Sequence, residues 1–73
     1  MELREILARN VRKRRRAMGF NQEELAHRAG IDRTHVSNIE RCKHAVTIDL
    51  LGQLAVALDV EPTDLLMLNP ALG

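Results

Sequence analysis

Two short helical patterns separated by a break of three residues, Gly30-Ile31-Asp32, set the strongest limit on how this chain can fold. Before the break, Asn21 followed by Glu24 is a capping-box pattern that starts a helix, and Gly30 can end it. After the break, Asp32 can cap a second helix. A connection this short allows only a tight turn, so the two helices must meet at a steep angle.

Helical spacing also organises the segment that precedes this pair. Apolar residues recur at the intervals of one helix face at Leu3, Leu7, Val11 and Met18. The spacing predicts a helix over about residues 2–18 that stops at Gly19. Composition supports an all-α chain, because Phe20 is the only aromatic residue and good helix formers such as Leu, Ala, Arg and Glu are frequent.

Two further helices are expected in the second half of the chain. Thr47 can cap a helix whose inward stripe consists of Ile48, Leu51, Leu54, Ala55 and Leu58. Pro62 suits a first helical position and begins a short fifth helix that ends before Asn69. Because 73 residues make one small domain, we predict an all-α, five-helix bundle that forms a single domain over residues 1–73.

Charge is divided unevenly along the chain. All eleven Lys and Arg residues lie in residues 1–44 together with six acids, a net charge of +5, whereas residues 45–73 carry four acids and no base, a net charge of −4. This asymmetry favours contact between one face and a polyanion. The basic run KRRR at residues 13–16 is explained equally well by a solvated helix face.

Size and residue arrangement exclude several classes of function. A chain this short lacks the volume for a deep catalytic cleft, and it has no glycine-rich phosphate loop. We therefore expect no enzymatic activity and no cofactor. A single cysteine, the lack of a signal peptide and the lack of a long apolar run predict a protein of the reducing cytosol with no membrane span.

The second helix of the central pair has two different faces. At about 100° per residue, Val36 and Ile39 share one side, and the opposite side gathers Thr34, Ser37, Asn38 and Arg41. Side chains of these types suit base edges in the DNA major groove, where arginine binds guanine and asparagine binds adenine. The pair is a helix-turn-helix predicted to read DNA; without the turn, an ordinary exposed helix face would explain the same residues.

The segments NQEELAHRAGIDRTHVSNIE and TIDLLGQLAVALDVEPTDLL make the chain similar to the Cro and phage-repressor (XRE-type) helix-turn-helix family over about residues 6–68. The residues that carry the resemblance are Gln22, Leu25, Ala26, Ala29, Gly30, Ile31, Val36 and Ile39. The resemblance implies a bundle of the lambda-repressor-like type that regulates transcription. It also implies a homodimer that binds a palindromic operator in double-stranded DNA, with residues 33–41 in the major groove.

The resemblance assigns roles to particular residues. Base contacts are expected from Arg33, Thr34, Ser37 and Asn38, and phosphate contacts from Gln22, Arg41, Lys43 and His44. Gln22 also has a local rationale, because free N–H groups at a helix start attract phosphate. Arg15 and Glu40 are expected to form a charge pair that locks the reading helix onto the first helix, and its bidentate geometry requires arginine.

Arg14 departs from the family pattern, which usually has leucine at this position on the apolar stripe of the first helix. Two explanations remain open. The stem of Arg14 could cover apolar surface while its head reaches an acid, with Asp59, Glu61 and Asp64 as candidates. Alternatively, this end of the core is packed more loosely.

The helix of residues 33–41 is expected to end near Arg41 or Cys42. Cys42 occupies the position where the family usually has the glycine that ends this helix. A left-handed residue without glycine's freedom costs on the order of 1 kcal/mol, so we interpret Cys42 as a tolerated substitution. Its basic neighbours leave a redox-sensing thiol as an alternative. A metal site with His35 and His44 lacks ligand spacing, so no metal is expected, and these two histidines could instead touch a phosphate or a base edge.

Apolar residues near the end of the chain exceed what a small core can bury. Leu65, Leu66, Met67 and Leu68 are consecutive, and Leu50 falls outside the inward stripe of its helix. We expect these five residues to form the homodimer interface. The alternative is an antitoxin or another protein-interaction module that covers a protein partner with the same apolar helix.

Overall fold

The computed structural model describes residues 2–68, which form four α-helices and one 3-10 helix, with no strand in that range. The elements are α1 (Leu3–Ala17), α2 (Gln22–Ala29), α3 (Arg33–Glu40), α4 (Ile48–Leu58) and η1 (Pro62–Leu66). The all-α prediction is confirmed. The expected fifth α-helix is instead a 3-10 helix of five residues, and its expected end before Asn69 lies outside the described residues.

Local capping signals place most of the helix ends where the sequence predicted them. The side chains of Asn21 and Thr47 accept hydrogen bonds from Glu24 N at 2.7 Å and Leu50 N at 3.1 Å, so both act as N-caps. Asp32 occupies the N-cap position of α3, but its side chain makes no capping hydrogen bond. The prediction that α3 begins after Asp32 is therefore correct, but the predicted capping hydrogen bond from its side chain is not formed.

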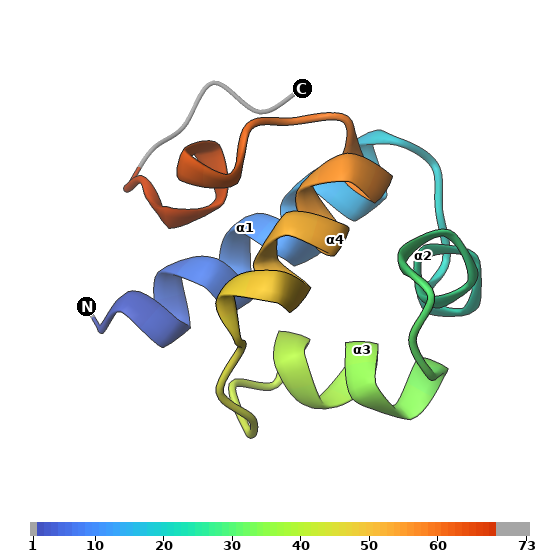
Figure 1. Cartoon of the computed structure of the whole chain (residues 1–73), viewed down its shortest axis with the longest axis horizontal. Helices are drawn as coiled ribbons and strands as arrows, with labels where there is room; N and C mark the ends of the chain where they lie inside the picture. The colour runs from blue at the N-terminus through green and yellow to red at the C-terminus, as the bar shows by residue number, and fades with distance from the viewer. Residues whose placement is uncertain (1, 69–73) are drawn as a thin grey trace.

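The helices pack around a common core, with α1 and α4 lying between α3 at one edge and η1 at the other (Figure 1). The buried apolar cluster consists of Leu7, Val11, Leu25, Ala26, Ala29, Val36, Ile39, Leu50, Leu54, Ala55, Leu58 and Leu65. Every α-helix and η1 contribute to this cluster. One side of α3 is therefore fixed to the body of the domain while its other side faces outward.

The inward face of α4 is rotated from the expected one. Ile48 is 86% exposed and Leu50 only 7% exposed, the reverse of the prediction. Leu50, Leu54 and Leu58 follow one another at intervals of four residues, so together they form a continuous row along the helix. That row faces the core, whereas Ile48 in the first turn projects past the edge of the packed helices. Leu3, expected on the buried stripe of α1, is likewise exposed.

Two polar residues of α1 fasten distant parts of the chain. Arg14 Nε donates to the carbonyl oxygen of Leu58 at 2.9 Å, at the C-terminal end of α4, where helical carbonyls lack partners. Its head group thus reaches the region expected but bonds a carbonyl rather than an acid. The buried amide of Asn10 donates to the carbonyl oxygens of Leu65 at 3.0 Å and Met67 at 2.8 Å. These bonds give partners to two carbonyls at and just after the end of η1, and at Met67 the chain is extended.

None of the helices within residues 2–68 combines the length and the apolar character needed to cross a membrane.

Candidate nucleic-acid interface

The turn between α2 and α3 is built as the sequence indicated. Gly30 adopts the left-handed conformation with φ 72°, which glycine enters without strain. The amide of Ile31 then donates to the carbonyl of Ala26 at 3.0 Å, which closes the end of α2. Because α3 starts at Arg33, directly after this turn, its orientation relative to α2 is fixed by local backbone geometry.

The polar side of α3 forms a surface that we call the reading face, made of Arg33, Thr34, Ser37, Asn38 and Arg41. Arg33, Thr34 and Arg41 are exposed, and Ser37 and Asn38 are half-buried. Val36 and Ile39 lie in the core on the other side of the helix. The structure therefore brings the four residues expected to contact bases onto one outward face.

Two members of the reading face also contact each other. Arg41 Nη2 donates to Asn38 Oδ1 at 3.3 Å. This exposed contact occupies the amide oxygen of Asn38 and leaves its NH₂ group able to donate. Arg41 and Asn38 thus form one polar unit at the C-terminal end of α3.

The expected Arg15–Glu40 ion pair is present and buried. Arg15 Nε lies 2.6 Å from Glu40 Oε2 and Nη2 lies 3.0 Å from Oε1, a bidentate contact in which the two side chains are only 11% and 3% exposed. Arg15 Nη1 also donates to the carbonyl of Phe20 at 2.9 Å. We call the Arg15–Glu40 pair the clamp, because it joins the end of α3 to α1 and to the chain just before α2.

Gln22 and Arg12 also reach Glu40. Gln22 Nε2 donates to Glu40 Oε1 at 3.3 Å, so the residue expected to bind phosphate is held beside the clamp. Arg12 Nη2 donates to the backbone carbonyl of Glu40 at 2.6 Å, and Arg12 Nε lies 3.8 Å from Oε1. Sequence reasoning missed Arg12, because the basic run at 12–16 gives no local signal of which arginines point inward.

Asn10 was missed for a different reason. It is only 3% exposed, and it lies one turn from Leu7 on the side of α1 that packs against η1. Its position one turn from a residue of the apolar stripe could have indicated that Asn10 is buried. A buried amide in turn requires hydrogen-bond partners. The partners are backbone carbonyls 55 and 57 residues away, which no local pattern identifies.

Cys42 has the left-handed conformation expected at the end of the reading helix, with φ 60°. The amide of Cys42 donates to the carbonyl of Ile39 at 3.0 Å, and the amide of Lys43 donates to that of Asn38 at 2.8 Å. These two bonds make a Schellman motif, the usual end of a helix with a left-handed residue. Cys42 therefore adopts the left-handed backbone conformation that glycine usually provides at this position.

The remaining residues expected to contact phosphate are the last residue of this motif and the one that follows it. Lys43 and His44 are exposed, and His44 meets His35 edge to face, with the ring centroids 5.8 Å apart. Among the described residues, no three His, Cys, Asp or Glu side chains are grouped closely enough to hold a metal ion. The basic and imidazole groups at this end of α3 thus border the reading face.

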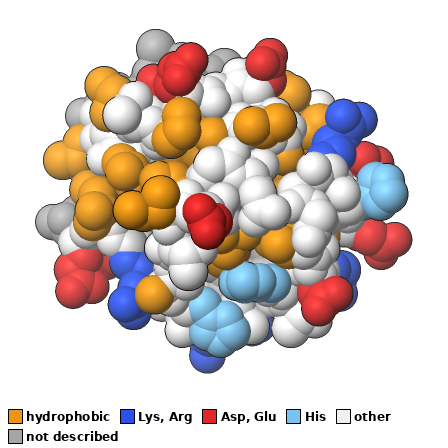
Figure 2. All heavy atoms as spheres, in the orientation of Figure 1, with side chains coloured by type: hydrophobic (Ala, Val, Ile, Leu, Met, Phe, Trp, Pro, Cys, Tyr) orange, Lys and Arg blue, Asp and Glu red, His pale blue; other side chains and the backbone are white. Residues whose placement is uncertain are grey.

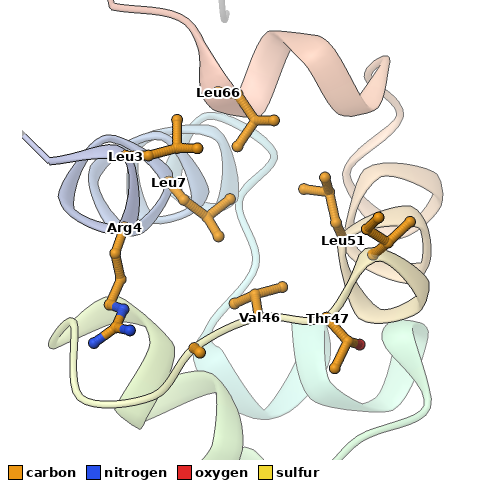
Figure 3. A pocket seen from close by; sticks show the side chains of 9 residues that line it. Leu3, Arg4, Leu7, Val46, Thr47, Leu51 and Leu66 are labelled. Atoms are coloured by element: carbon orange, nitrogen blue, oxygen red, sulfur yellow. The ribbon is translucent and has the colours of Figure 1, made fainter.

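A second surface is an apolar groove between the start of α1, the start of α4 and η1. It has a volume of about 290 Å³, and its apolar walls are Leu3, Leu7, Ala45, Val46, Ile48, Leu51 and Leu66. Figure 3 shows leucine side chains from all three elements directed toward this space, while Arg4 points away from them. Hydrophobic side chains gather on the corresponding left side of the molecule in Figure 2.

The residues predicted to form the homodimer interface differ in how exposed they are. Leu50 and Leu65 are 7% and 0% exposed and belong to the core, so the prediction that they are free for a partner is wrong. The cause is the phase of α4 and the tight turn of η1, which direct both side chains inward. Leu66 is half-buried, whereas Met67 and Leu68 are exposed as expected.

Comparison with known proteins places these surfaces in a family context. A family model described as helix-turn-helix matches residues 11–65. A hypothetical transcription factor of Neisseria meningitidis is 41% identical over 66 residues, covering 90% of this chain and 62% of the relative. The chain thus spans less than two thirds of that relative's length.

Restriction-modification proteins are also among the similar chains. Control protein C.SmaI of Serratia marcescens is 41% identical over 66 residues, covering 90% of this chain and 79% of that protein. The crystal structure of the restriction-modification controller protein C.AhdI from Aeromonas hydrophila superimposes with a TM-score of 0.82 and 37% identity, covering 85% of this chain and 94% of that one. The chain is therefore similar in sequence to both proteins and similar in fold to C.AhdI.

Proposed function

Because this chain belongs to the XRE-type helix-turn-helix family of DNA-binding transcriptional regulators, we propose that it binds a palindromic operator as a homodimer, with α3 in the major groove. The observation that carries the proposal is the reading face, which is polar, outward-facing and held rigidly by the clamp. A rigid helix with donors and acceptors on one side suits direct readout of base edges.

In this proposal the roles divide between bases and phosphates. Arg33, Thr34, Ser37 and Asn38 contact base edges. Gln22, Arg41, Lys43 and His44 contact the phosphate backbone on either side, which fixes the register of the protein without reading sequence. The proposal places the protein in the cytosol, where its one cysteine stays reduced.

The apolar groove supports the dimeric part of the proposal. Met67 and Leu68, which follow η1, are exposed. Ile48 is 86% exposed and Leu3 is also exposed, and both line the groove, so a separate molecule leaves this apolar surface in water. A two-fold contact through this surface buries it in both copies. It would set the two α3 helices about 34 Å apart, one turn of DNA.

The same groove favours one alternative function. An antitoxin or another protein-interaction module would use it to cover a protein partner, and DNA binding would then be secondary. The names of similar control proteins favour the regulator, and in either case activity would follow protein concentration and assembly.

Selection from random DNA tests the proposal directly. We expect enrichment of inverted repeats whose half-sites lie about 10 base pairs apart, and an affinity that falls steeply with salt concentration. Failure to enrich any sequence, combined with stable binding of a protein partner, would favour the alternative. Enrichment of direct repeats would contradict a two-fold dimer.

A further inference from the structure

The geometry around the clamp points to one more DNA contact: Arg12 and Gln22 together bind a backbone phosphate beside the C-terminal end of α3. This inference rests on the proposed function and assigns it a residue, Arg12, that neither the sequence pattern nor the family resemblance marks. Arg12 acts here as a binding residue, and Glu40 positions it.

Both side chains are held at the same carboxylate oxygen. Gln22 Nε2 lies 3.3 Å and Arg12 Nε 3.8 Å from Glu40 Oε1, and Arg12 Nη2 donates to the Glu40 carbonyl at 2.6 Å. These contacts bring an amide from α2 and a guanidinium from α1 close together before DNA arrives. Little side-chain entropy then remains to be lost on binding.

The charge of Arg12 is only partly compensated in this arrangement, because Arg12 Nε lies as far as 3.8 Å from Glu40 Oε1. Glu40 faces Arg15 with both carboxylate oxygens, at 2.6 and 3.0 Å, so that carboxylate is already matched to one guanidinium. The short bond of Arg12 goes instead to a neutral backbone carbonyl. Because 43% of its side chain is exposed, Arg12 can offer its remaining N–H groups to an anion.

The position of Glu40 puts this cation on the flank of the reading face. Ser37 precedes Glu40 by three residues, so the two side chains occupy neighbouring rows of α3. When Ser37 approaches a base edge, the phosphate strand beside the groove lies next to that row. The carbonyls at the end of α3 carry partial negative charge, which Arg12 offsets by its bond to Glu40.

Gln22 adds a neutral donor to the same place. Its amide nitrogen has two hydrogens and Glu40 accepts one of them, so the other is available to a phosphate oxygen. The guanidinium of Arg12 would then attract the phosphate by its charge, and the amide of Gln22 would orient it by a directional hydrogen bond. The competing explanation is that Arg12 only fixes the end of α3, so the test must separate charge from structure.

The test measures the salt dependence of DNA affinity for the wild type and three variants, Arg12→Ala, Arg12→Lys and Arg12→Gln. Duplexes selected from random DNA and random-sequence duplexes are both used. Removing one phosphate contact should reduce the slope of log affinity against log salt by about 0.9 for each protomer bound. We expect this reduction in Arg12→Ala and Arg12→Gln on both duplexes, and recovery of the slope in Arg12→Lys.

Lys13→Ala is the matched control. Lys13 is exposed and follows Arg12 by about 100° around α1, so the variant loses the same charge on a different side of the helix and should keep the wild-type slope. Thermal unfolding of each variant verifies that it folds. If the Arg12→Gln variant folds and keeps the wild-type slope, the charge of Arg12 meets no phosphate, and the inference is overturned.

Failure of the inference and failure of the proposed function give different results. Selective wild-type binding with an unchanged slope in Arg12→Ala overturns only the role of Arg12. A wild type that binds selected and random duplexes equally overturns the regulator proposal, whereas one that binds no DNA overturns both.

Discussion

Two residues of this protein adopt a backbone conformation that is unfavourable for their side chains. Cys42 at φ 60° and Asp59 at φ 56° are the non-glycine residues with positive φ among residues 2–68. In this conformation a β-carbon crowds the following carbonyl oxygen at a cost of about 1–2 kcal/mol, which aspartate tolerates better than most residues. Cys42 therefore carries more backbone strain than Asp59, although both end a helix.

Replacing Cys42 with glycine should relieve that strain. We expect Cys42→Gly to raise the free energy of unfolding by about 0.5–1 kcal/mol in denaturant titrations while DNA affinity stays unchanged. Asp59→Gly is the matched control and should gain less. A net loss of stability in Cys42→Gly would mean that the half-buried side chain contributes more through packing than the strain costs. A DNA-binding response to peroxide that disappears with the thiol would reveal a redox role.

The proposed division between base and phosphate contacts can be tested with single substitutions. Arg33→Ala and Asn38→Ala should each cost about 1–3 kcal/mol of binding to the selected operator and relax the preference at one base position. Gln22→Ala should weaken selected and random duplexes by the same factor. Equal losses on both duplexes for Arg33→Ala would assign that residue to the phosphate backbone.

Among the elements, α3 is the one whose position depends most on a single buried group. Glu40 is 3% exposed in its side chain and joins α3 to α1 through Arg15, and to the start of α2 through Gln22. Leaving either charge of the Arg15–Glu40 clamp unpaired in the interior is costly, because burial removes the water that would solvate it. The clamp thus holds α3 in one orientation relative to α1, and this fixes the direction in which the reading face points.

A double-mutant cycle on the clamp tests this view. Arg15→Ala and Glu40→Ala should each lower the free energy of unfolding by up to about 3–5 kcal/mol, and the double variant should lose less than the larger single loss. The exposed pair Arg28–Glu24, 2.8 Å apart on α2, is the control, where a coupling of about 0.3–0.5 kcal/mol is expected. Additive losses at Arg15 and Glu40 would rule out the clamp.

The elements also show how far the sequence predicts the fold. The ranges of α1 to α4 and the cap at Thr47 were predictable because capping residues and apolar spacing act within a few positions. The left-handed Cys42 was predictable only from the resemblance to a family that usually has glycine there. The rotation of α4 that buries Leu50 and exposes Ile48 was not, since several leucines allow more than one inward face and only packing against α1 and α2 selects one.

The candidate site divides in the same way. The reading face and the Arg15–Glu40 pair could be predicted, the first from helical periodicity and the second from the family resemblance. Arg12 could not, because its partner is a backbone carbonyl on another helix. The 3-10 form of η1 was missed too, and so were the bonds from Asn10 to two carbonyls at and just after its end, because those partners lie 55 and 57 residues from Asn10 in the chain.

In the whole molecule, the reading face and the apolar groove lie toward different edges. Figure 1 shows α3 at one edge and η1 at the other, with α1 and α4 between them. The basic run is not simply a solvated face, because Arg12, Arg14 and Arg15 bond groups on α3, α4 and the chain before α2. Several of the charges that gave the first half of the chain its polarity therefore also hold the bundle together.

Ile48→Asp should separate the proposed dimer. Ile48 is 86% exposed, so aspartate there should disturb folding little, but it would place a charge in the buried interface and cost several-fold or more in association. We expect monomers by sedimentation and weakened operator binding. Leu66→Asp should also separate the subunits, but Leu66 packs against the core, so its effects on folding must be measured alongside.

Val56→Asp is the control for Ile48→Asp. Val56 is on the same helix and 83% exposed, but it borders a different hollow, near Arg14 and Pro62. The Val56→Asp protein should remain dimeric and bind the operator normally. Wild-type protein that stays monomeric at micromolar concentration, both free and on DNA, would contradict the dimer, and dissociation in both variants would show a general effect of added charge.

The two hydrogen bonds from Asn10 have a consequence for how relatives of this protein can diverge. They attach the end of η1 and the chain that follows it to α1 through one side chain and two backbone carbonyls, so these bonds do not depend on the exposed side chains of Met67 and Leu68. Residues such as Met67 and Leu68 can then be exchanged without disturbing α3. Duplicated genes could in this way acquire mutually exclusive pairing while keeping the same operator, or keep their pairing while acquiring new operators.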